Sequence, residues 1–320
     1  MSPSPADLPA VAKALRVAFG TLVLDSWTPL SGGLSGAAVW RIRVGGIAYL
    51  LKVEAQERDD LRDSHRSYAC MRLAAQACLA PRVRYADADD GVAILDHIAA
   101  AEHLGSQADL VVELAQAVRV LHGVEGFPPL IDYLDGLDAL VGRAQSAVPE
   151  GAFAPWARLY GVCKALEPQP VSSHNDLNPR NLIHDGRRVW LIDWEAAFRA
   201  DRYVDLAAIA NTYAADPGGE ALLLRTYFNR EATAAERARL WLFRQVSHVF
   251  HAAIFLAGQA RVESLDGPEL DAIHQGLALG APLLDTPEGR RDYGLARLRT
   301  ATATANLGSE AFAEAASIAR

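Results

Sequence analysis

The feature that most constrains the fold is a short island of strand-like sequence inside a largely helical half of the chain. Its runs are VSSHND (171–176), NLIH (181–184) and RVWLIDW (188–194). The last two runs flank Asp185-Gly186, a turn pair that favours a β-hairpin. Such a hairpin brings Asn181, before its first strand, close to Asp193, after its second strand.

The sequence around this island predicts strands in the first third of the chain and mostly helices after it. Expected strands cover 21–30, 37–44, 47–55, 83–87 and 91–98. Expected helices cover 7–19, 64–79, 109–122, 132–146, 153–167, 219–229 and 233–257, from apolar residues at helical spacing. We therefore predict an α+β chain with a β-rich lobe at 1–97 and a helical lobe at 98–320.

Composition excludes several classes of protein. The chain has 31 Lys and Arg against 39 Asp and Glu, a formal net charge of -8, which argues against coating nucleic-acid phosphates. No window approaches the roughly 20 apolar residues of a membrane span, and the first residues lack a secretory pattern. The three cysteines form no C-x-x-C pair, so we expect buried thiols and a cytoplasmic protein without membrane or nucleic-acid partners.

Three polar side chains converge on the open end of the predicted hairpin. Asp176 lies five residues before Asn181, across a loop stiffened by Pro179, and Asp193 follows the second strand. One amide and two carboxylates suit Mg²⁺, which takes a few protein oxygens together with water and phosphate oxygens. Each residue alone could be an ordinary turn residue. Their order and close spacing favour a metal and phosphate site.

The pattern HNDLNPRN…LIDWE resembles the choline/ethanolamine kinase and aminoglycoside phosphotransferase family, over about residues 30–255. The His-Asn-Asp triplet is more similar to the choline/ethanolamine branch. The resemblance implies a two-lobed, protein-kinase-like fold with ATP and Mg²⁺ as cofactors. It also implies that Asp176 accepts the proton of the substrate hydroxyl, while Asn181 and Asp193 hold Mg²⁺.

The N-terminal lobe adds candidate nucleotide-binding residues. Gly32, Gly33 and Ser35 lie in SGGLSG between two strands, where backbone amides could approach phosphate, although such a segment is often only a turn. Lys52 is one of three lysines beside 28 arginines, and the family uses this position for phosphate contact. Adenine is expected against the backbone from Asp96 to Ile98, where the chain leaves the strands.

The chain departs from the family pattern at two places. The predicted helix after Ser64 contains no Asp or Glu, although kinases pair the lysine with a helix glutamate. Asp63, Asp60 or Asp193 could replace it as the partner of Lys52. Ala196-Ala197 follows Glu195 where choline kinases usually carry a tyrosine.

Four further residues receive expected roles. Glu195 and Trp241 are candidates for binding a cationic acceptor, through charge and a cation–π contact. Their alternatives are an arginine ion pair for Glu195 and helix packing for Trp241. His174 and Asp205 are expected to be structural, with Asp205 buried, capping the following helix and accepting hydrogen bonds from the catalytic loop.

These features together predict a kinase that transfers the γ-phosphoryl group of ATP to a small-molecule hydroxyl. Choline, ethanolamine or a related amino alcohol is the leading acceptor class. An aminoglycoside or sugar kinase is the alternative enzyme. A nucleotide-binding pseudokinase scaffold is the alternative from another class, favoured by the missing helix glutamate and disfavoured by Asp176, Asn181 and Asp193.

Overall fold

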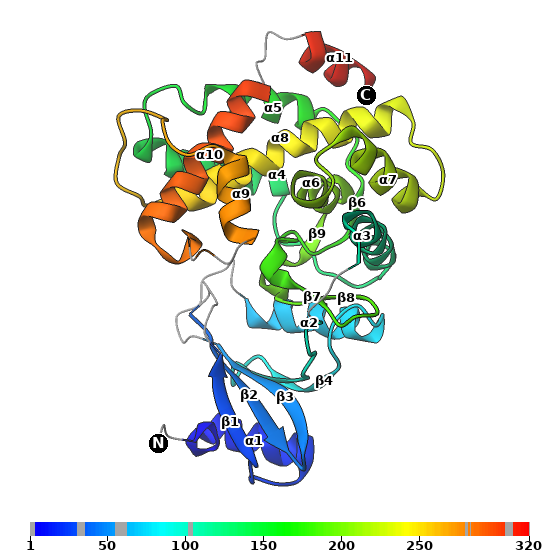
Figure 1. Cartoon of the computed structure of the whole chain (residues 1–320), viewed down its shortest axis with the longest axis vertical. Helices are drawn as coiled ribbons and strands as arrows, with labels where there is room; N and C mark the ends of the chain where they lie inside the picture. The colour runs from blue at the N-terminus through cyan, green and yellow to red at the C-terminus, as the bar shows by residue number, and fades with distance from the viewer. Residues whose placement is uncertain are drawn as a thin grey trace. The chain divides into compact units, whose positions relative to one another are not determined.

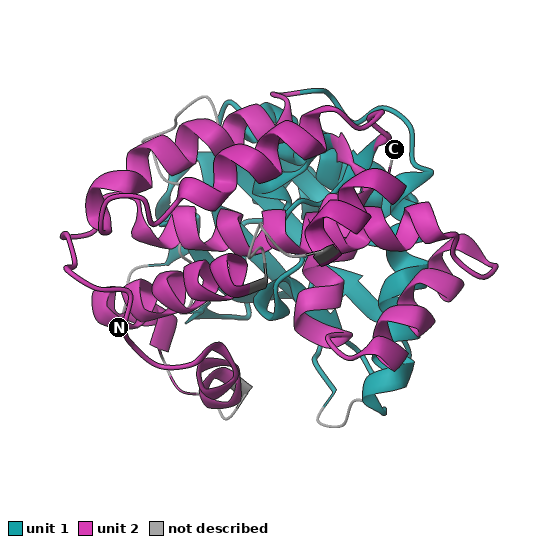
Figure 2. Ribbon diagram, turned by 90° about the horizontal axis from the view of Figure 1, so that it is seen from above, with its two compact units in different colours: residues 1–129, 171–199 teal, residues 130–170, 200–320 magenta. Residues whose placement is uncertain are grey.

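The structure is a computed structural model that describes residues 4–30, 36–54, 63–101, 105–278, 281, 283–304 and 310–319. Figure 1 shows a β-rich N-terminal part and a helical C-terminal part, which confirms the predicted α+β class. The chain divides into two compact units, coloured separately in Figure 2. Unit 1 comprises residues 1–129 and 171–199, and unit 2 comprises 130–170 and 200–320.

Unit 1 contains a five-stranded antiparallel sheet in the order β1-β2-β3-β5-β4. The strands are β1 (Ser26–Leu30), β2 (Ala38–Val44), β3 (Ile47–Val53), β4 (Val83–Asp87) and β5 (Val92–Asp96). Gly45 and Gly46 both have positive φ, at 58° and 78°, so the tight β2–β3 turn requires a residue without a Cβ atom. The register places Lys52 of the central strand β3 opposite Ala93 of β5.

Two helices that the sequence predicts in unit 1 pack beside this sheet, and capping residues define where they begin or end. Helix α1 (Pro9–Phe19) follows a short 3-10 turn, η1 (Pro5–Asp7), and Gly20 ends it in the left-handed region. Apolar residues of α1 and the sheet form one core, namely Val11, Ala14, Leu15, Ile42, Tyr49, Leu51, Val92 and Ile94. Helix α2 (Ser64–Gln76) begins at Asp63, whose side chain accepts a hydrogen bond from the His65 amide at 2.9 Å.

The cysteines only partly follow the prediction. Cys70 and Cys163 are buried, and burial raises the pKa of both thiols to about 12. Cys78 is exposed, so its predicted burial is wrong. Helix α2 ends at Gln76, and Cys78 lies beyond it with φ 60°, outside the helical face that packs inward.

The predicted hairpin forms in unit 1, together with a third helix. Its strands are β7 (Leu182–His184) and β8 (Val189–Leu191), and the amide of Ile192 donates to the carbonyl of Asn181 at 3.0 Å. Helix α3 (Gln107–His122) begins with a Ser106–Asp109 capping box. Glu113 of α3 lies 3.0 Å from His184 Nε2, which fixes the hairpin to α3.

Short elements surround the hairpin on both sides. Strand β6 (Pro170–Ser173) precedes it and pairs with β9 (Phe198–Asp201), while the 3-10 turns η3 (Pro179–Asn181) and η4 (Trp194–Ala196) flank it. The amide of Leu191 donates to the carbonyl of Leu79 at 2.8 Å, which joins β8 to the segment after α2. The hairpin is therefore held by α3 and by the segment after α2.

Unit 2 is helical, and its elements pack around one long helix. They are α4 (Tyr133–Ala144), η2 (Gln145–Ala147), α5 (Ala154–Lys164), α6 (Arg202–Tyr213), α7 (Pro217–Phe228), α8 (Ala234–Leu256), α9 (Leu270–Ala278), η5 (Leu283–Asp285), α10 (Pro287–Thr304) and α11 (Glu310–Ile318). Helix α8 packs against α4, α5, α6, α10 and α11. Among the described residues, no helix is both long and apolar enough to cross a membrane.

The unit boundaries differ from the lobe boundary placed at residues 97 and 98. Residues 98–129 and the hairpin group with the N-terminal sheet rather than with the helical unit. The assignment of 1–97 and 98–320 as lobes therefore stays a prediction. The hairpin contacts with α3 and the segment after α2 explain this grouping physically.

Candidate active site

Asp176 lies in a loop whose side chains hold its carboxylate from both sides. Asn178 Nδ2 donates to Oδ1 and Asn181 Nδ2 donates to Oδ2, each at 2.9 Å. The same Asn181 amide also donates to the carbonyl of Asp176 at 2.9 Å. Both carboxylate oxygens are thus oriented before any substrate arrives, as a fixed proton acceptor requires.

The loop takes this shape because of its local sequence. Asn178 caps η3 by accepting the Arg180 amide, and Pro179 occupies the first position of that turn, where its missing N–H costs nothing. Asn175 adopts a positive φ of 64°, and its Nδ2 donates to the carbonyl of Ala196 at 3.0 Å. The loop is therefore joined to the segment after the hairpin.

Asn181 and Asp193 lie together at the open end of the hairpin, as predicted. The hydrogen bond between Ile192 and Asn181 closes this end. Both hydrogens of the Asn181 side-chain amide are donated to Asp176. The side-chain oxygen of Asn181, Oδ1, is left for another partner. Asp193 has a positive φ of 63°. Burial raises the pKa of Asp193, Lys52 opposes this shift, and the neighbouring Glu195 and Asp176 add to it.

Lys52 is the centre of an ion cluster in unit 1. Its ammonium lies 2.6 Å from Glu195, 3.2 Å from Glu54 and 3.8 Å from Asp193. Its side chain is only 18% exposed. Burial alone lowers the pKa of Lys52, but Asp193, Glu195 and Glu54 together raise it above its ordinary value. Lys52 is therefore a half-buried, charged cation whose ammonium contacts residues that follow the hairpin.

The expected partners of Lys52 meet different outcomes. Asp193 lies near Lys52, as one of the three alternatives predicted. Asp63 instead caps α2, and Asp60 lies outside the described residues. Two carboxylates closer than Asp193 were not predicted, those of Glu195 and Glu54. The missing helix acid is thus replaced by acids from the segments that follow β3 and the hairpin.

His174 has the structural position that the sequence predicts. It is fully buried, its Nε2 lies 3.0 Å from the carbonyl of Ile192, and its ring lies 4.7 Å from the Trp194 ring. It therefore joins the start of the catalytic loop to the hairpin end that carries Asp193.

The other predicted nucleotide-binding residues are only partly placed. Gly32, Gly33 and Ser35 lie outside the described residues. Asp96 ends β5, and its amide already donates to the carbonyl of Arg82 at 2.9 Å, while its carboxylate bonds Arg84. Ile98 lies just beyond β5, half-buried. Adenine contact at Asp96 and Ile98 stays a prediction. The Asp96 amide already has a backbone partner, the carbonyl of Arg82.

The predicted acceptor residues lie in different units. Glu195 follows the hairpin in unit 1, where its carboxylate is bonded to Lys52 rather than to the arginine that its alternative role required. Trp241 lies on α8 in unit 2, half-buried, with its ring 6.3 Å from Phe312 of α11. This contact matches the helix-packing alternative. Acceptor binding by both residues stays a prediction.

Asp205 is fully buried on α6, as expected, but it does not cap that helix. Asp201 is the cap, and its side chain accepts the Tyr203 amide at 3.0 Å. The predicted cap is wrong because β9 leads directly into the helix, whose cap lies four residues earlier than the sequence suggested. Its hydrogen bonds to the catalytic loop stay a prediction.

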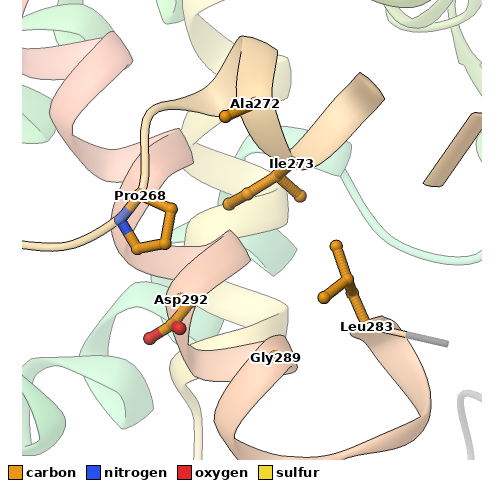
Figure 3. Close-up of a pocket in the computed structure, with 6 residues that line it drawn as sticks. All are labelled: Pro268, Ala272, Ile273, Leu283, Gly289 and Asp292. Atoms are coloured by element: carbon orange, nitrogen blue, oxygen red, sulfur yellow. The ribbon is translucent and has the colours of Figure 1, made fainter. Parts of the chain in front are cut away.

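A separate cavity of about 230 Å³ lies in unit 2 and contains none of the predicted site residues. Figure 3 shows the lining residues, which are Pro268, Ala272, Ile273, Leu283, Gly289 and Asp292. A side chain at position 289 would overlap the carbonyl of Leu283, so the approach of α10 to η5 requires glycine. The lining is mostly apolar and offers no arrangement for phosphoryl transfer.

Sequence reasoning missed two residues of the site. Asn178 was read as part of a loop, although its side chain holds Asp176. Glu54 was read as the end of a strand, although its two-residue spacing from Lys52 places both on one face of an extended chain. That spacing is the signal that could have found it.

Comparison with known proteins identifies the family and the fold. The family model described as the phosphotransferase enzyme family matches residues 26–241. A choline/ethanolamine kinase family protein from Mesorhizobium loti is 21% identical, with a TM-score of 0.69, and the match covers 98% of this chain and 99% of that protein. A choline kinase from Streptococcus pneumoniae is 16% identical, with a TM-score of 0.66 and coverage of 92% and 98%.

A third similar structure carries a different substrate. A spectinomycin phosphotransferase solved with ADP and spectinomycin is 13% identical, with a TM-score of 0.56 and coverage of 92% and 97%. No curated protein sequence matches the chain. These similarities confirm the predicted protein-kinase-like fold. The family match extends over more than half of the sequence, so the chain belongs to the phosphotransferase enzyme family.

Proposed function

We propose that the protein transfers the γ-phosphoryl group of ATP to the hydroxyl of a small molecule, with Mg²⁺ as the metal. The observation that carries this proposal is the loop in which Asn178 and Asn181 hold the Asp176 carboxylate, next to Asp193. Phosphoryl transfer needs little covalent chemistry from the protein, only positioning and charge stabilisation. The held carboxylate of Asp176 supplies positioning, and the ammonium of Lys52, which lies 3.8 Å from Asp193, supplies charge stabilisation.

Each residue has one role in the proposed reaction. Asp176 accepts the proton of the acceptor hydroxyl as that oxygen attacks the γ-phosphorus. Lys52 contacts the phosphates of the nucleotide and keeps its charge inside the protein because carboxylates surround it. Asn181 and Asp193 hold the metal.

The donor set fits Mg²⁺ in its chemistry. Among the described residues, no three His, Cys, Asp or Glu side chains meet around a single point. Mg²⁺ commonly takes only one or two protein carboxylates and completes its shell with phosphate oxygens and water. The side-chain oxygen of Asn181, Oδ1, and the carboxylate of Asp193 are hard donors of that kind. Bound there, Mg²⁺ would neutralise charge on the β- and γ-phosphates.

The metal role is tested by Asp193→Ala. We expect this variant to lose the Mg²⁺-dependent part of its ATP affinity, since a metal-bridging carboxylate is removed. Calorimetry with ATP at saturating and zero Mg²⁺ measures that part directly. Unchanged MgATP affinity would remove Asp193 from the metal site.

The leading acceptor class is an amino alcohol such as choline or ethanolamine. The His-Asn-Asp triplet supports it, and so do the names of two similar structures, a choline/ethanolamine kinase family protein and a choline kinase. The acid-rich surroundings of Lys52 also provide carboxylates that could attract an ammonium group. Glu195 is one of these carboxylates, and it must release Lys52 before it can bind the acceptor.

The experiment is an ADP-release assay with MgATP and a panel of acceptors. The panel contains choline, ethanolamine, neutral polyols and an aminocyclitol antibiotic, and Asp176→Asn serves as the inactive control. Acceptor-dependent ADP release with amino alcohols supports the proposal. Preference for polyols or the antibiotic would favour the second enzyme candidate, which the similarity to spectinomycin phosphotransferase supports. ATP binding without any turnover would favour a pseudokinase.

A further inference from the structure

Helix α2 contributes no carboxylate to the cluster around Lys52. Its sequence, SHRSYACMRLAAQ, contains neither Asp nor Glu. In protein kinases a glutamate of the small-lobe helix orients the lysine that contacts the phosphates. Another group must therefore orient the Lys52 ammonium in this chain.

Glu54 is placed to do this from the strand that carries Lys52. It follows β3 two residues beyond Lys52, and extended chain directs residues i and i+2 to the same face. The Glu54 amide donates to the carbonyl of Gly91 at 2.8 Å, so its backbone continues the pairing with the next strand. Its Oε1 lies 3.2 Å from the Lys52 ammonium, and its side chain is only 11% exposed.

Helix α2 reaches Glu54 through a hydroxyl group. Tyr68 of α2, which is 3% exposed, donates from its hydroxyl to Glu54 Oε1 at 3.2 Å. The tyrosine side chain has only two rotatable bonds, so a buried ring fixes the hydroxyl with little entropy left to lose. The lysine and the helix are thus connected through one carboxylate oxygen.

Glu195 contacts Lys52 in a different way. Helix α2 holds its backbone, because Arg66 Nη2 donates to the Glu195 carbonyl at 2.7 Å. Its carboxylate is bonded to Lys52 at 2.6 Å, from a position 143 residues away in the sequence. Glu54 has a fixed backbone and a side chain held by Tyr68, whereas the Glu195 side chain is held at the lysine alone among the bonds described.

We propose that Glu54, held by Tyr68, is the positioning residue that orients Lys52 toward the nucleotide phosphates, and that this frees Glu195 to exchange partners. The inference rests on the proposed function, in which Lys52 contacts those phosphates. Helix α2 then controls the lysine indirectly, through a tyrosine and a strand glutamate.

The first test needs no nucleotide and uses the scarcity of lysine in this chain. Lys13, Lys52 and Lys164 are its only lysines, so acetylation by an N-hydroxysuccinimide ester can be followed for each by mass spectrometry. Since Glu54 holds the Lys52 ammonium at 3.2 Å, we expect Glu54→Gln to release this side chain, to speed labelling of Lys52 several-fold and to leave Lys13 and Lys164 unchanged.

The second test is a double-mutant cycle on MgATP affinity, measured by calorimetry. Glu54→Gln should weaken MgATP binding about tenfold, and Tyr68→Phe a few-fold, with the acceptor KM unchanged. In a Lys52→Ala background both changes should add less than about twofold, because the group they orient is absent. Tyr68→Phe keeps the cycle measurable if Glu54→Gln does not fold.

Matched controls separate orientation from general damage. Glu220→Gln removes a carboxylate of α7 that pairs with Arg244 in unit 2, and Tyr85→Phe removes a half-buried hydroxyl of β4 that bonds Asp87. Both should leave Lys52 labelling and MgATP affinity unchanged. If the Glu54→Gln effect is equally large without Lys52, or if Lys52 labelling does not change, the positioning role is wrong. If Lys52→Ala itself leaves MgATP affinity unchanged, the phosphate role of the proposed function fails first.

Discussion

The two units of the protein each bury a basic side chain, and they compensate its charge in different ways. In unit 1, Lys52 is surrounded by the carboxylates of Glu195, Glu54 and Asp193. In unit 2, Arg297 is 2% exposed and its guanidinium donates to His248 Nδ1 at 3.1 Å and lies 3.4 Å from His274 Nε2. One cation has acidic partners and the other has neutral ones.

This difference changes which group adjusts its protonation. Arginine stays charged and can only donate, so the histidine nitrogens facing it must be unprotonated acceptors. Burial, followed by the charge of Arg297, lowers the pKa of His251 to about 3 and of His274 to about 4. Around Lys52 the carboxylates instead raise the lysine pKa. We infer that the unit 1 cluster exchanges charged partners, whereas the unit 2 cluster is a fixed part of the helical core.

The largest expected effect comes from Asp176→Asn. A general base contributes roughly 10²- to 10⁴-fold to turnover, and the amide cannot take the hydroxyl proton. We expect that loss in kcat, with MgATP affinity within a few-fold of the wild type. Steady-state kinetics and calorimetry measure the two quantities. Near-normal turnover would mean that the unit 1 cluster does not perform the proposed chemistry.

Two lysines with similar bonding give the next prediction. Lys13 also contacts two carboxylates, Asp87 at 2.9 Å and Asp90 at 2.6 Å, but its side chain is 53% exposed. Lys52→Ala should lower kcat/KM for ATP about 10- to 100-fold, the range for a hydrogen bond to a charged group. Lys13→Ala should change it less than twofold. Equal effects would show that burial beside the hairpin gives Lys52 no special role.

These residues also show what the sequence can predict. Asp176, Asn181 and Asp193 were found because a turn and a hairpin of 20 residues bring them together locally. The pairing of Lys52 with Glu195 depends on how the sheet packs on the hairpin, which no local pattern encodes. Glu54 is within reach of sequence spacing, because residues i and i+2 of an extended chain share a face.

The helical unit was predicted less completely, for a physical reason. Helices α4 to α8 follow apolar patterns, except that α6 was recognised only as an apolar run after Asp205. Helix α10, PEGRRDYGLARLRTATAT, carries four arginines and no continuous apolar stripe. One of those arginines, Arg297, is nevertheless buried, because Tyr293 and the histidines satisfy its donors. The polar sequence of α10 therefore contains no apolar pattern that predicts the helix or the cluster around Arg297.

A smaller effect is expected from Glu195→Gln. If its carboxylate recognises an ammonium group, the acceptor KM should rise about tenfold, consistent with a hydrogen bond to a charged group. The ATP KM should change little, because Glu54 still holds Lys52. Kinetics with ethanolamine and a neutral polyol separate charge recognition from general damage. An unchanged acceptor KM, or better turnover of polyols, would favour the sugar-kinase alternative.

The smallest expected effect tests the neutral cluster of unit 2 through its stability. A histidine with a lowered folded-state pKa contributes stability that is present above its unfolded value of 6.5 and is lost as the pH falls. For His274 the loss runs from about 6.5 down to about 4, because the unfolded chain binds the proton first. The carboxylate of Asp271 opposes this shift, and burial and Arg297 cause it. Urea unfolding at pH 7.5, 6 and 5 should therefore show a smaller decline with acidification in His274→Gln than in the wild type. His65→Gln, at a side chain that is 67% exposed in unit 1, is measured in parallel as the control. If His274→Gln and the wild type lose stability in parallel, His274 carries a proton in the folded protein, and the contrast between the two buried cations does not hold.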